Sequence, residues 1–429
     1  MKKTFLALGL MTASAALAAQ EYGSPPPAAP PAVPQADQKA PAKGKKEAAA
    51  PGSRQVKISK PAQKAVIELQ NAVAAKDVAT IPAKLAAAKA VATTDEDRYY
   101  IGVVEMKAGI AAKDNAMIAS GIEAINASNQ APPEEAALNY LNLGKVYNNL
   151  KQTDKAVAAL ERARQLNPGD TEATVILAET QAARGQGAAA VGLLQQAMAA
   201  KKAAGQKVDE MWHKRALTLA YNAKLPVTST LARAWVLDYP TSVNWKDAIR
   251  IYRNLNKPAD PLLLDLLRLQ RVTGSLDGDI DYNAYVYIAA DQRNAREGKL
   301  LLDEAAAAGK IDLNKPVFKE LEAGLKTRPM PGEEIISKSA ETQLAGSDGP
   351  ALVVTANRFY GIGKPARAAE LFRAALAKPG VDKNQVNLQL GIALAAAGDK
   401  AGAKAAFDAV GGDRAEIAKY WLTYLATKA

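Results

Sequence analysis

The sequence contains no cysteine and only one histidine, His213. This composition excludes Cys–His nucleophilic sites, the usual structural zinc sites and the HExxH metalloprotease motif. A Ser–His–Asp triad would have to use His213, which stands beside Trp212 with no nucleophile elbow nearby. We therefore expect a structural or surface role for His213, and we predict no metal site, no cofactor and no enzyme activity.

Long apolar runs are absent after the first 18 residues, so no transmembrane segment is expected. The beginning of the chain is typical of a signal peptide, because Lys2 and Lys3 precede an apolar run from Phe5 to Leu17. Small residues in Ala16-Leu17-Ala18 favour cleavage after Ala18, with Ala19 as the alternative. Since no cysteine follows that point, a lipoprotein anchor is excluded. The predicted location is the periplasm, or outside the cell after secretion.

Residues 19–60 contain many prolines, alanines and lysines but few large apolar side chains. Such a segment cannot offset the entropy of ordering, so we predict a disordered linker. It either stays solvated as a tether or contacts acidic envelope surfaces through its lysines. The net charge of +11 is concentrated in residues 1–60, which hold nine basic and three acidic residues. The charge left for residues 61–429 is dilute, and no nucleic-acid partner is expected.

Aromatic residues make up only 5% of the chain, whereas alanine is abundant. From Pro61 onward, apolar residues such as Val66, Leu69 and Val73 recur at helical spacing, and no alternating run typical of a strand stands out. Alanine has the highest helix propensity, and its small side chain lets helices approach closely. The composition and spacing predict an all-α fold.

The clearest pattern is a 34-residue unit at 137–170. Its marker residues are Tyr140, Leu143, Gly144, Tyr147, Ala156, Leu160, Ala163 and Pro168. In type and spacing they resemble the tetratricopeptide repeat (TPR), a helix–turn–helix unit. One unit cannot bury its own apolar face, so the resemblance implies stacked neighbours. Gly144 and Ala156 are expected to be small because the two helices of the unit cross there.

Further units extend the pattern along the chain. Residues 171–204, 349–382 and 384–417 keep many of the marker places, and 209–242 keeps fewer. Residues 61–135 and 280–345 are interpreted as helix pairs without the full signature. Over 61–429 the resemblance therefore implies an α-solenoid of about ten stacked TPR-like hairpins forming a right-handed superhelix. The last helix, near Glu416 to Leu425, is expected to cap the stack with Trp421.

Three short motifs have alternative interpretations. Gly361-Ile362-Gly363-Lys364 resembles part of a phosphate loop, but Arg358 and Pro365 replace its required glycine and Ser/Thr, so a turn between helices is expected. Asp277, Asp279 and Asp281 have calcium-loop spacing but lack the glycine and the final glutamate, so an acidic loop is favoured over weak cation binding. The pair Asp260-Pro261 predicts a helix start with Asp260 as N-cap.

The TPR resemblance also implies a concave groove lined by the first helix of each hairpin. Mapping the family's groove places onto the clear units selects as contact candidates Lys145, Asn148, Glu179, Asn357 and Tyr360. The lining lacks the family's set of basic and asparagine side chains that clamps a terminal carboxylate. The predicted partner is a protein or peptide held in the groove.

These observations together predict an exported, non-enzymatic scaffold that mediates protein–protein interactions in the cell envelope. The alternative is an accessory factor in cell-wall or exopolysaccharide assembly or export, which would contact glycan or a synthase complex. Nothing in the sequence identifies the partner.

Overall fold

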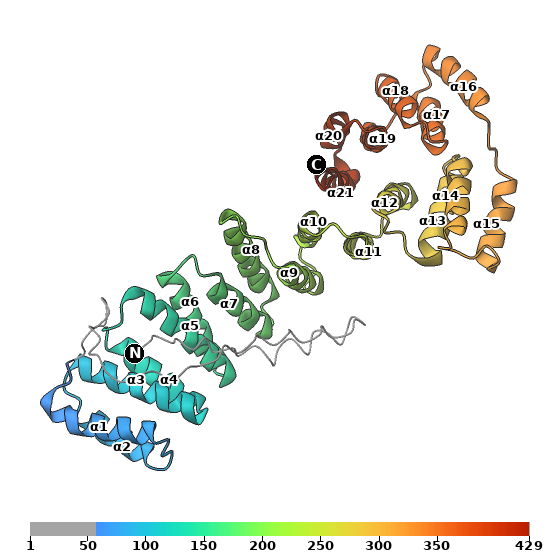
Figure 1. Ribbon diagram of the computed structural model, residues 1–429. Helices are drawn as coiled ribbons and strands as arrows, with labels where there is room; N and C mark the ends of the chain where they lie inside the picture. Colours follow the sequence, from blue (N-terminus) through green and yellow to red (C-terminus); the bar gives the residue numbers. More distant parts are fainter. Residues whose placement is uncertain (1–56, 429) are drawn as a thin grey trace, which may run out of the picture. The chain divides into compact units, whose positions relative to one another are not determined.

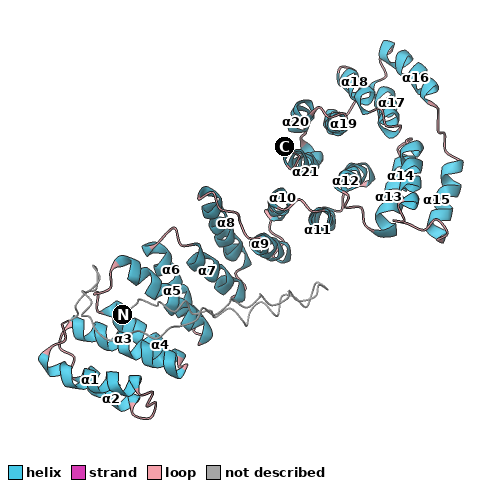
Figure 2. Cartoon of the chain, in the orientation of Figure 1, coloured by secondary structure: helices cyan, strands magenta, loops and turns pink. Residues whose placement is uncertain are grey.

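The computed structural model describes residues 57–428, and all regular structure in that range is helical (Figure 1, Figure 2). The predicted signal peptide 1–18 lies outside the described residues, as does the predicted linker as far as residue 56. The all-α prediction is confirmed: the described part of the chain is an α-solenoid of stacked helical hairpins.

The first eleven helices are α1 Lys60–Ala74, α2 Ile81–Ala90, α3 Asp95–Ala112, α4 Asn115–Ala127, α5 Pro133–Asn149, α6 Thr153–Leu166, α7 Thr171–Ala183, α8 Gly187–Ala203, α9 Glu210–Asn222, α10 Thr228–Asp238 and α11 Ser242–Asn256. The remaining ones are α12 Asp260–Thr273, α13 Gly278–Asp291, α14 Ala295–Ala307, α15 Pro316–Lys326, α16 Glu333–Ala345, α17 Gly349–Gly361, α18 Pro365–Leu376, α19 Lys383–Ala396, α20 Lys400–Asp408, the 3-10 turn η1 Gly412–Arg414 and α21 Ala415–Ala426.

Consecutive helices pair as hairpins from α1/α2 to α13/α14, and again in α17/α18 and α19/α20. Within the clearest unit, α5 and α6 cross at Gly144, where an added Cβ would lie 2.5 Å from Leu160 Cγ. Gly391 on α19 has the same role, since a Cβ there would lie 2.4 Å from the Phe407 ring on α20. The prediction that small residues allow these crossings is confirmed.

Polar side chains cap the N-termini of several helices. Thr94 and Asp97 form a capping box at the start of α3. The buried Asp97 carboxylate also accepts hydrogen bonds from the backbone N–H and hydroxyl of Ser59, just before α1. Burial alone would raise the pKa of Asp97, but the hydrogen bonds from Ser59, Thr93 and Thr94 hold it well below its usual range. The start of α1 is thereby fastened to α3.

At α12 the structure corrects the predicted cap. The helix begins at Asp260 as expected, but its N-cap is Ala259, and no side chain caps the helix. Pro261 still occupies the first turn, where its missing N–H costs nothing.

The expected helix pair at α15 and α16 is also corrected. Instead of packing on each other as a hairpin, α15 packs on α13 and α14, and α16 packs on α17 and α18. Their connection contains Pro329 and Pro331, which cannot continue a helix and favour extended backbone before them. As a result α14 contacts α17 directly, so the order of packing skips one pair of helices.

The C-terminal helix differs from the expected cap. Besides α20, α21 contacts α10, α12 and α19 (Figure 1). The Trp421 indole N–H donates to the Asp265 carbonyl oxygen at 3.2 Å, and Arg233 Nε donates to Glu416 at 2.9 Å. One continuous core accordingly joins α7–α12 to α16–α21. Trp421 therefore closes this part of the solenoid on itself.

Candidate interaction surface

The first helices of three neighbouring hairpins, α5, α7 and α9, lie next to one another through polar contacts. Lys145 Nζ on α5 lies 2.6 Å from Glu172 Oε1 on α7. One turn further along α5, Asn148 Nδ2 donates to Thr180 Oγ1 at 2.8 Å. These contacts place Lys145 and Asn148 side by side on the seam between two hairpins.

The same pattern continues from α7 to α9. Glu179 on α7 accepts hydrogen bonds from Arg215 Nε and Nη2 on α9, at 2.8 to 3.1 Å. Both side chains remain accessible, at 44% exposure for Glu179 and 35% for Arg215. Lys145 is 27% exposed. Ion pairs this exposed contribute only about 0–1 kcal/mol, so they can be exchanged for contacts with another molecule at little cost.

Polar contacts between first helices recur along the chain. Gln70 on α1 contacts Tyr100 on α3, and the Tyr99 hydroxyl donates to Glu135 on α5 at 2.7 Å. Beyond α9, Asn244 on α11 donates to Glu210 at 2.9 Å. Polar side chains therefore line the joins between successive hairpins from α1 to α11.

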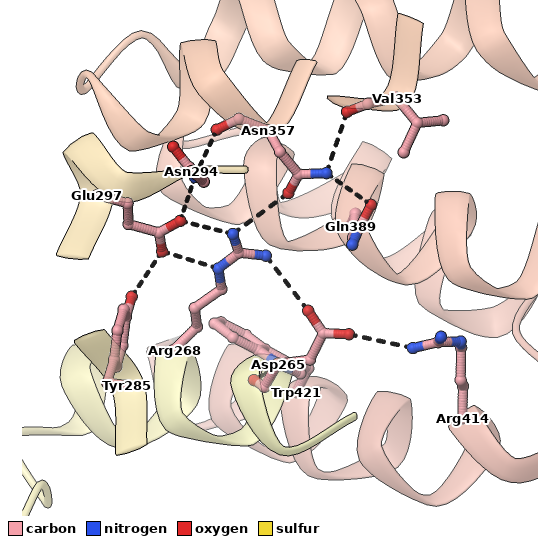
Figure 3. A network of polar contacts seen from close by, with 10 residues as sticks. All are labelled: Asp265, Arg268, Tyr285, Asn294, Glu297, Val353, Asn357, Gln389, Arg414 and Trp421. Atoms are coloured by element: carbon pink, nitrogen blue, oxygen red, sulfur yellow. Dashed lines mark hydrogen bonds and ion pairs between the residues drawn. The ribbon is translucent and has the colours of Figure 1, made fainter. Parts of the chain in front are cut away.

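The other two groove candidates, Asn357 and Tyr360 on α17, lie in a different environment. Asn357 Oδ1 accepts from Arg268 Nη2 at 3.2 Å, and its amide donates to Gln389 at 3.0 Å (Figure 3). The Arg268 guanidinium also lies 4.8 Å from the centre of the Tyr360 ring. Burial raises the pKa of the Tyr360 phenol to about 12. The two side chains thus contact Arg268 on α12, which lies 89 residues before Asn357.

Arg268 is the centre of a buried polar network (Figure 3). It forms a bidentate pair with Glu297 on α14, with Nε–Oε1 and Nη2–Oε2 distances of 2.9 and 2.7 Å. Glu297 also accepts from the Tyr285 hydroxyl at 2.7 Å and from Asn294. Burial would raise the pKa of Glu297, but Arg268 and Tyr285 lower it below its usual range, so Glu297 is charged.

A second carboxylate joins this network to the end of the chain. Asp265 on α12 lies 3.3 Å from Arg268 Nη1 on one side and 3.3 Å from Arg414 Nη1 on the other. Burial raises the pKa of Asp265 to about 6, against the opposing effect of the two arginines. The network therefore connects α12 with α13, α14, α17 and the turn before α21.

Sequence reasoning did not find this network. Asp265 and Arg268 do carry a signal, because both stand within the leucine-rich stretch of α12 and are buried together with Leu264, Leu266 and Leu267. Charged residues at core positions need a partner, but the sequence cannot say that the partners are Glu297 and Arg414.

The two other short motifs lie at a turn and at the start of a helix. Gly361 ends α17, and Ile362 to Lys364 form the predicted turn before α18, with Gly363 at φ +75°. Asp277 precedes α13, whereas Asp279 and Asp281 lie in its first turn, so the expected acidic loop is helical from Gly278 onward. Asp281 is buried and pairs with Arg253 at 2.6 Å.

Residues 57–428 contain neither a candidate metal site nor a membrane-spanning helix. No three or more His, Asp or Glu side chains gather there as a metal ion would require. None of the helices in this range has the length and hydropathy needed to cross a bilayer.

The part of the chain from α5 to α7 matches a known protein family. The sequence profile described as the tetratricopeptide repeat matches residues 137–180, the region that contains Gly144 and Leu160. The chain carries a tetratricopeptide repeat. The resemblance predicted from the spacing of Tyr140 to Pro168 is thereby confirmed. Stacked repeats of this kind are typical of scaffolds that bind proteins.

Solved structures similar to this chain include a tetratricopeptide repeat protein from Parabacteroides merdae, with 11% identity, a TM-score of 0.29 and coverage of 77% of this chain and 99% of that one. PilF of Pseudomonas aeruginosa is 14% identical, with a TM-score of 0.26 and coverage of 58% and 98%. A Naa15/Naa10 structure bound to HypK-THB is 13% identical, with a TM-score of 0.28 and coverage of 81% and 57%. No curated protein matches the sequence.

Proposed function

We propose that this TPR-containing chain is an exported, non-enzymatic scaffold that binds a protein or peptide partner on the first-helix face of α5, α7 and α9. The observation that carries the proposal is the row of accessible polar pairs on that face. Lys145–Glu172 and Arg215–Glu179 present both signs of charge at successive joins, with Asn148 between them. A partner can replace these weak pairs with contacts of its own.

The partner face is restricted to these hairpins because Asn357 and Tyr360, the candidates on α17, already have partners within the chain. Displacing them would expose the buried Arg268, whose charge is expensive to separate from Glu297. The exposed pairs on α5, α7 and α9 carry no such cost. The proposed partner surface is thus made of Lys145, Asn148, Glu172, Glu179 and Arg215.

A double charge reversal, Lys145→Glu with Arg215→Glu, tests this surface. Tagged full-length protein would be cross-linked in an envelope extract, and the co-purified proteins would be quantified by mass spectrometry. We expect the main partner to be lost, while Glu161→Lys on the exposed face of α6 retains it. If the double variant has the helical circular dichroism of the wild type and captures every partner equally well, the proposed face is wrong.

The proposed export is tested separately. Cell fractionation should place the tagged protein in the periplasm or medium, and its mature N-terminus should begin at Ala19. Recovery of full-length protein still carrying Met1 in the cytoplasm would contradict export and leave the proposed binding face to be judged by the first experiment.

A further inference from the structure

Three arginines surround one small pocket where α14, α16 and α17 meet. Arg293 and Arg296 flank the start of α14, and Arg358 lies near the end of α17. Apolar side chains, Pro331 and Ile336, form part of the opposite wall. This pocket exists because the proline-containing connection carries α16 away from α15 and toward α17.

These arginines differ from all the others in the described part of the chain. The other fourteen arginines between residues 57 and 428 each contact a carboxylate or another side-chain oxygen. Within that range, only Arg293, Arg296 and Arg358 have no side-chain acceptor. All three arginines without a side-chain acceptor line the same pocket, which suggests that they serve a common ligand.

One of the three arginines, Arg358, is held in place by a hydrogen bond. Arg358 Nε donates to the Arg293 carbonyl oxygen at 3.3 Å, which ties α17 to the turn before α14. Burial, together with the nearby charge of Arg293, lowers the pKa of the Arg358 guanidinium below its usual range. Gathering like charges without a counterion is unfavourable, so an anion bound among them would relieve the repulsion.

Two further features increase the positive potential. The pocket includes Ala295 at the first turn of α14, and Asn294 provides no side-chain cap there. The positive end of the helix dipole therefore lies at the pocket, where the buried Glu297 in the same turn opposes it only in part because Glu297 also pairs with Arg268. Neighbouring acids are engaged elsewhere: Glu297 pairs with the buried Arg268, and Asp291 lies 3.9 Å from Arg328. No carboxylate of the described residues lines the pocket.

We propose that Arg293, Arg296 and Arg358 form a binding site for a phosphoryl group. Planar guanidinium groups donate parallel hydrogen bonds to phosphate oxygens, and a dianion with three outer oxygens can engage several arginines at once. The phosphoryl group could belong to free phosphate or to a lipid headgroup. The site lies on α14 and α17, so the proposal does not depend on the partner face of α5, α7 and α9.

Calorimetric titration of the full chain with inorganic phosphate, at constant ionic strength, tests the proposal. We expect saturable binding to the wild type that is at least about tenfold weaker in Arg293→Gln/Arg358→Gln, because two charge-assisted donors are lost. A matched control, Arg162→Gln/Arg367→Gln, removes two exposed arginines from other helices and should bind normally. Without phosphate the pocket variant should unfold at the same temperature as the wild type or higher, since repulsion is removed.

Vesicle co-sedimentation distinguishes the two sources. Vesicles containing phosphatidate in phosphatidylcholine would be compared with pure phosphatidylcholine. Binding to phosphatidate that is lost in the pocket variant supports a lipid headgroup, whereas binding of inorganic phosphate alone supports a small soluble ligand. The proposal is overturned if neither probe binds, if the pocket variant binds as tightly as the wild type, or if it unfolds earlier without phosphate, which would indicate a structural role.

Discussion

The helices α1–α9 and the helices α10–α21 pack in two different ways, although α7–α9 share one apolar core with the second group. In the first region, each hairpin contacts its neighbours, and exposed pairs such as Lys145–Glu172 line the joins. In the second, α21 returns to α10 and α12, and buried groups such as Arg268 and Asp265 link helices far apart in sequence. The first is typical of a one-dimensional repeat array, whereas the second resembles a globular core.

This difference implies different responses to perturbation. In a one-dimensional array, stability is a sum over units and nearest-neighbour interfaces. Closure through α21 adds contacts between sequence-distant helices, so α10–α21 should unfold more cooperatively. The four tryptophans, Trp212, Trp235, Trp245 and Trp421, all lie from α9 onward. Tryptophan fluorescence therefore reports mainly on the second region, while circular dichroism reports on both.

The largest expected effect comes from Arg268→Met. It would leave Glu297 and Asp265 buried without their shared guanidinium, which typically costs about 3–5 kcal/mol. Urea unfolding followed by tryptophan fluorescence should show a large shift of the midpoint to lower urea.

The matched control is Arg215→Met in the first region. Its pair with Glu179 is exposed, so the cost should be about 0–1 kcal/mol. Similar losses in the two variants would mean that the buried network contributes no more than a surface pair, and the contrast between the regions would fail.

An intermediate effect is expected from Gly144→Leu in the first region. The new side chain would overlap Leu160, since even a Cβ lies 2.5 Å from Leu160 Cγ, and overpacking of this kind costs roughly 1–3 kcal/mol. The loss should appear in circular dichroism, while the fluorescence transition of the second region stays in place.

Gly192→Leu on α8 is the control for that substitution. An added Cβ at Gly192 meets nothing within 4 Å, and leucine is the better helix former, so stability should be unchanged or higher. A Gly144→Leu variant as stable as this control would contradict the close crossing of α5 and α6.

Local features of the fold could be predicted from the sequence because a repeat encodes contacts between neighbours. Gly144 and Ala156 marked a helix crossing, and Gly363 marked a turn, since each acts within one hairpin. The return of α21 could not be predicted. Trp421 is apolar whether it caps a stack or packs against α12, and helical periodicity contains no information about a contact with Asp265, 156 residues earlier.

The sequence also could not predict which of the groove candidates are accessible. Family positions select Lys145 and Asn357 alike, because both occupy the first helix of a repeat. Whether such a position is accessible depends on distant helices, and only Asn357 has Arg268 opposite it. The displacement of α16 was not predicted either. Pro329 and Pro331 cannot continue a helix, but they do not show which helices α16 packs against.

The smallest expected effect concerns His213, at the boundary between the two regions. Its ring is 2% exposed, and Nε2 lies 2.9 Å from Asp238 Oδ2, which in turn lies 2.7 Å from Lys202 Nζ. Burial lowers the pKa of His213 below its usual value near 6.5, and this outweighs the opposing attraction of Asp238. The folded chain should hold His213 neutral at pH 7.

The sign of the pH dependence follows from proton uptake. Between the folded-state pKa and about pH 6.5, the unfolded chain binds more protons at His213 than the folded chain does. Stability from His213 is therefore complete above that window and is lost as the pH falls through it, by at most about 1.4 kcal/mol per pH unit. The raised pKa of Asp265 acts in the opposite direction, so the comparison must be made with His213→Gln.

Two measurements check this prediction. The difference in unfolding free energy between wild type and His213→Gln should shift in favour of the variant as the pH is lowered from 7 to 5. The single histidine also gives one imidazole resonance in the folded protein, whose titration midpoint should lie below 6.5. A midpoint at or above that value would mean that Asp238 outweighs burial, and that α9 and α10 hold a charged pair where we infer a neutral ring.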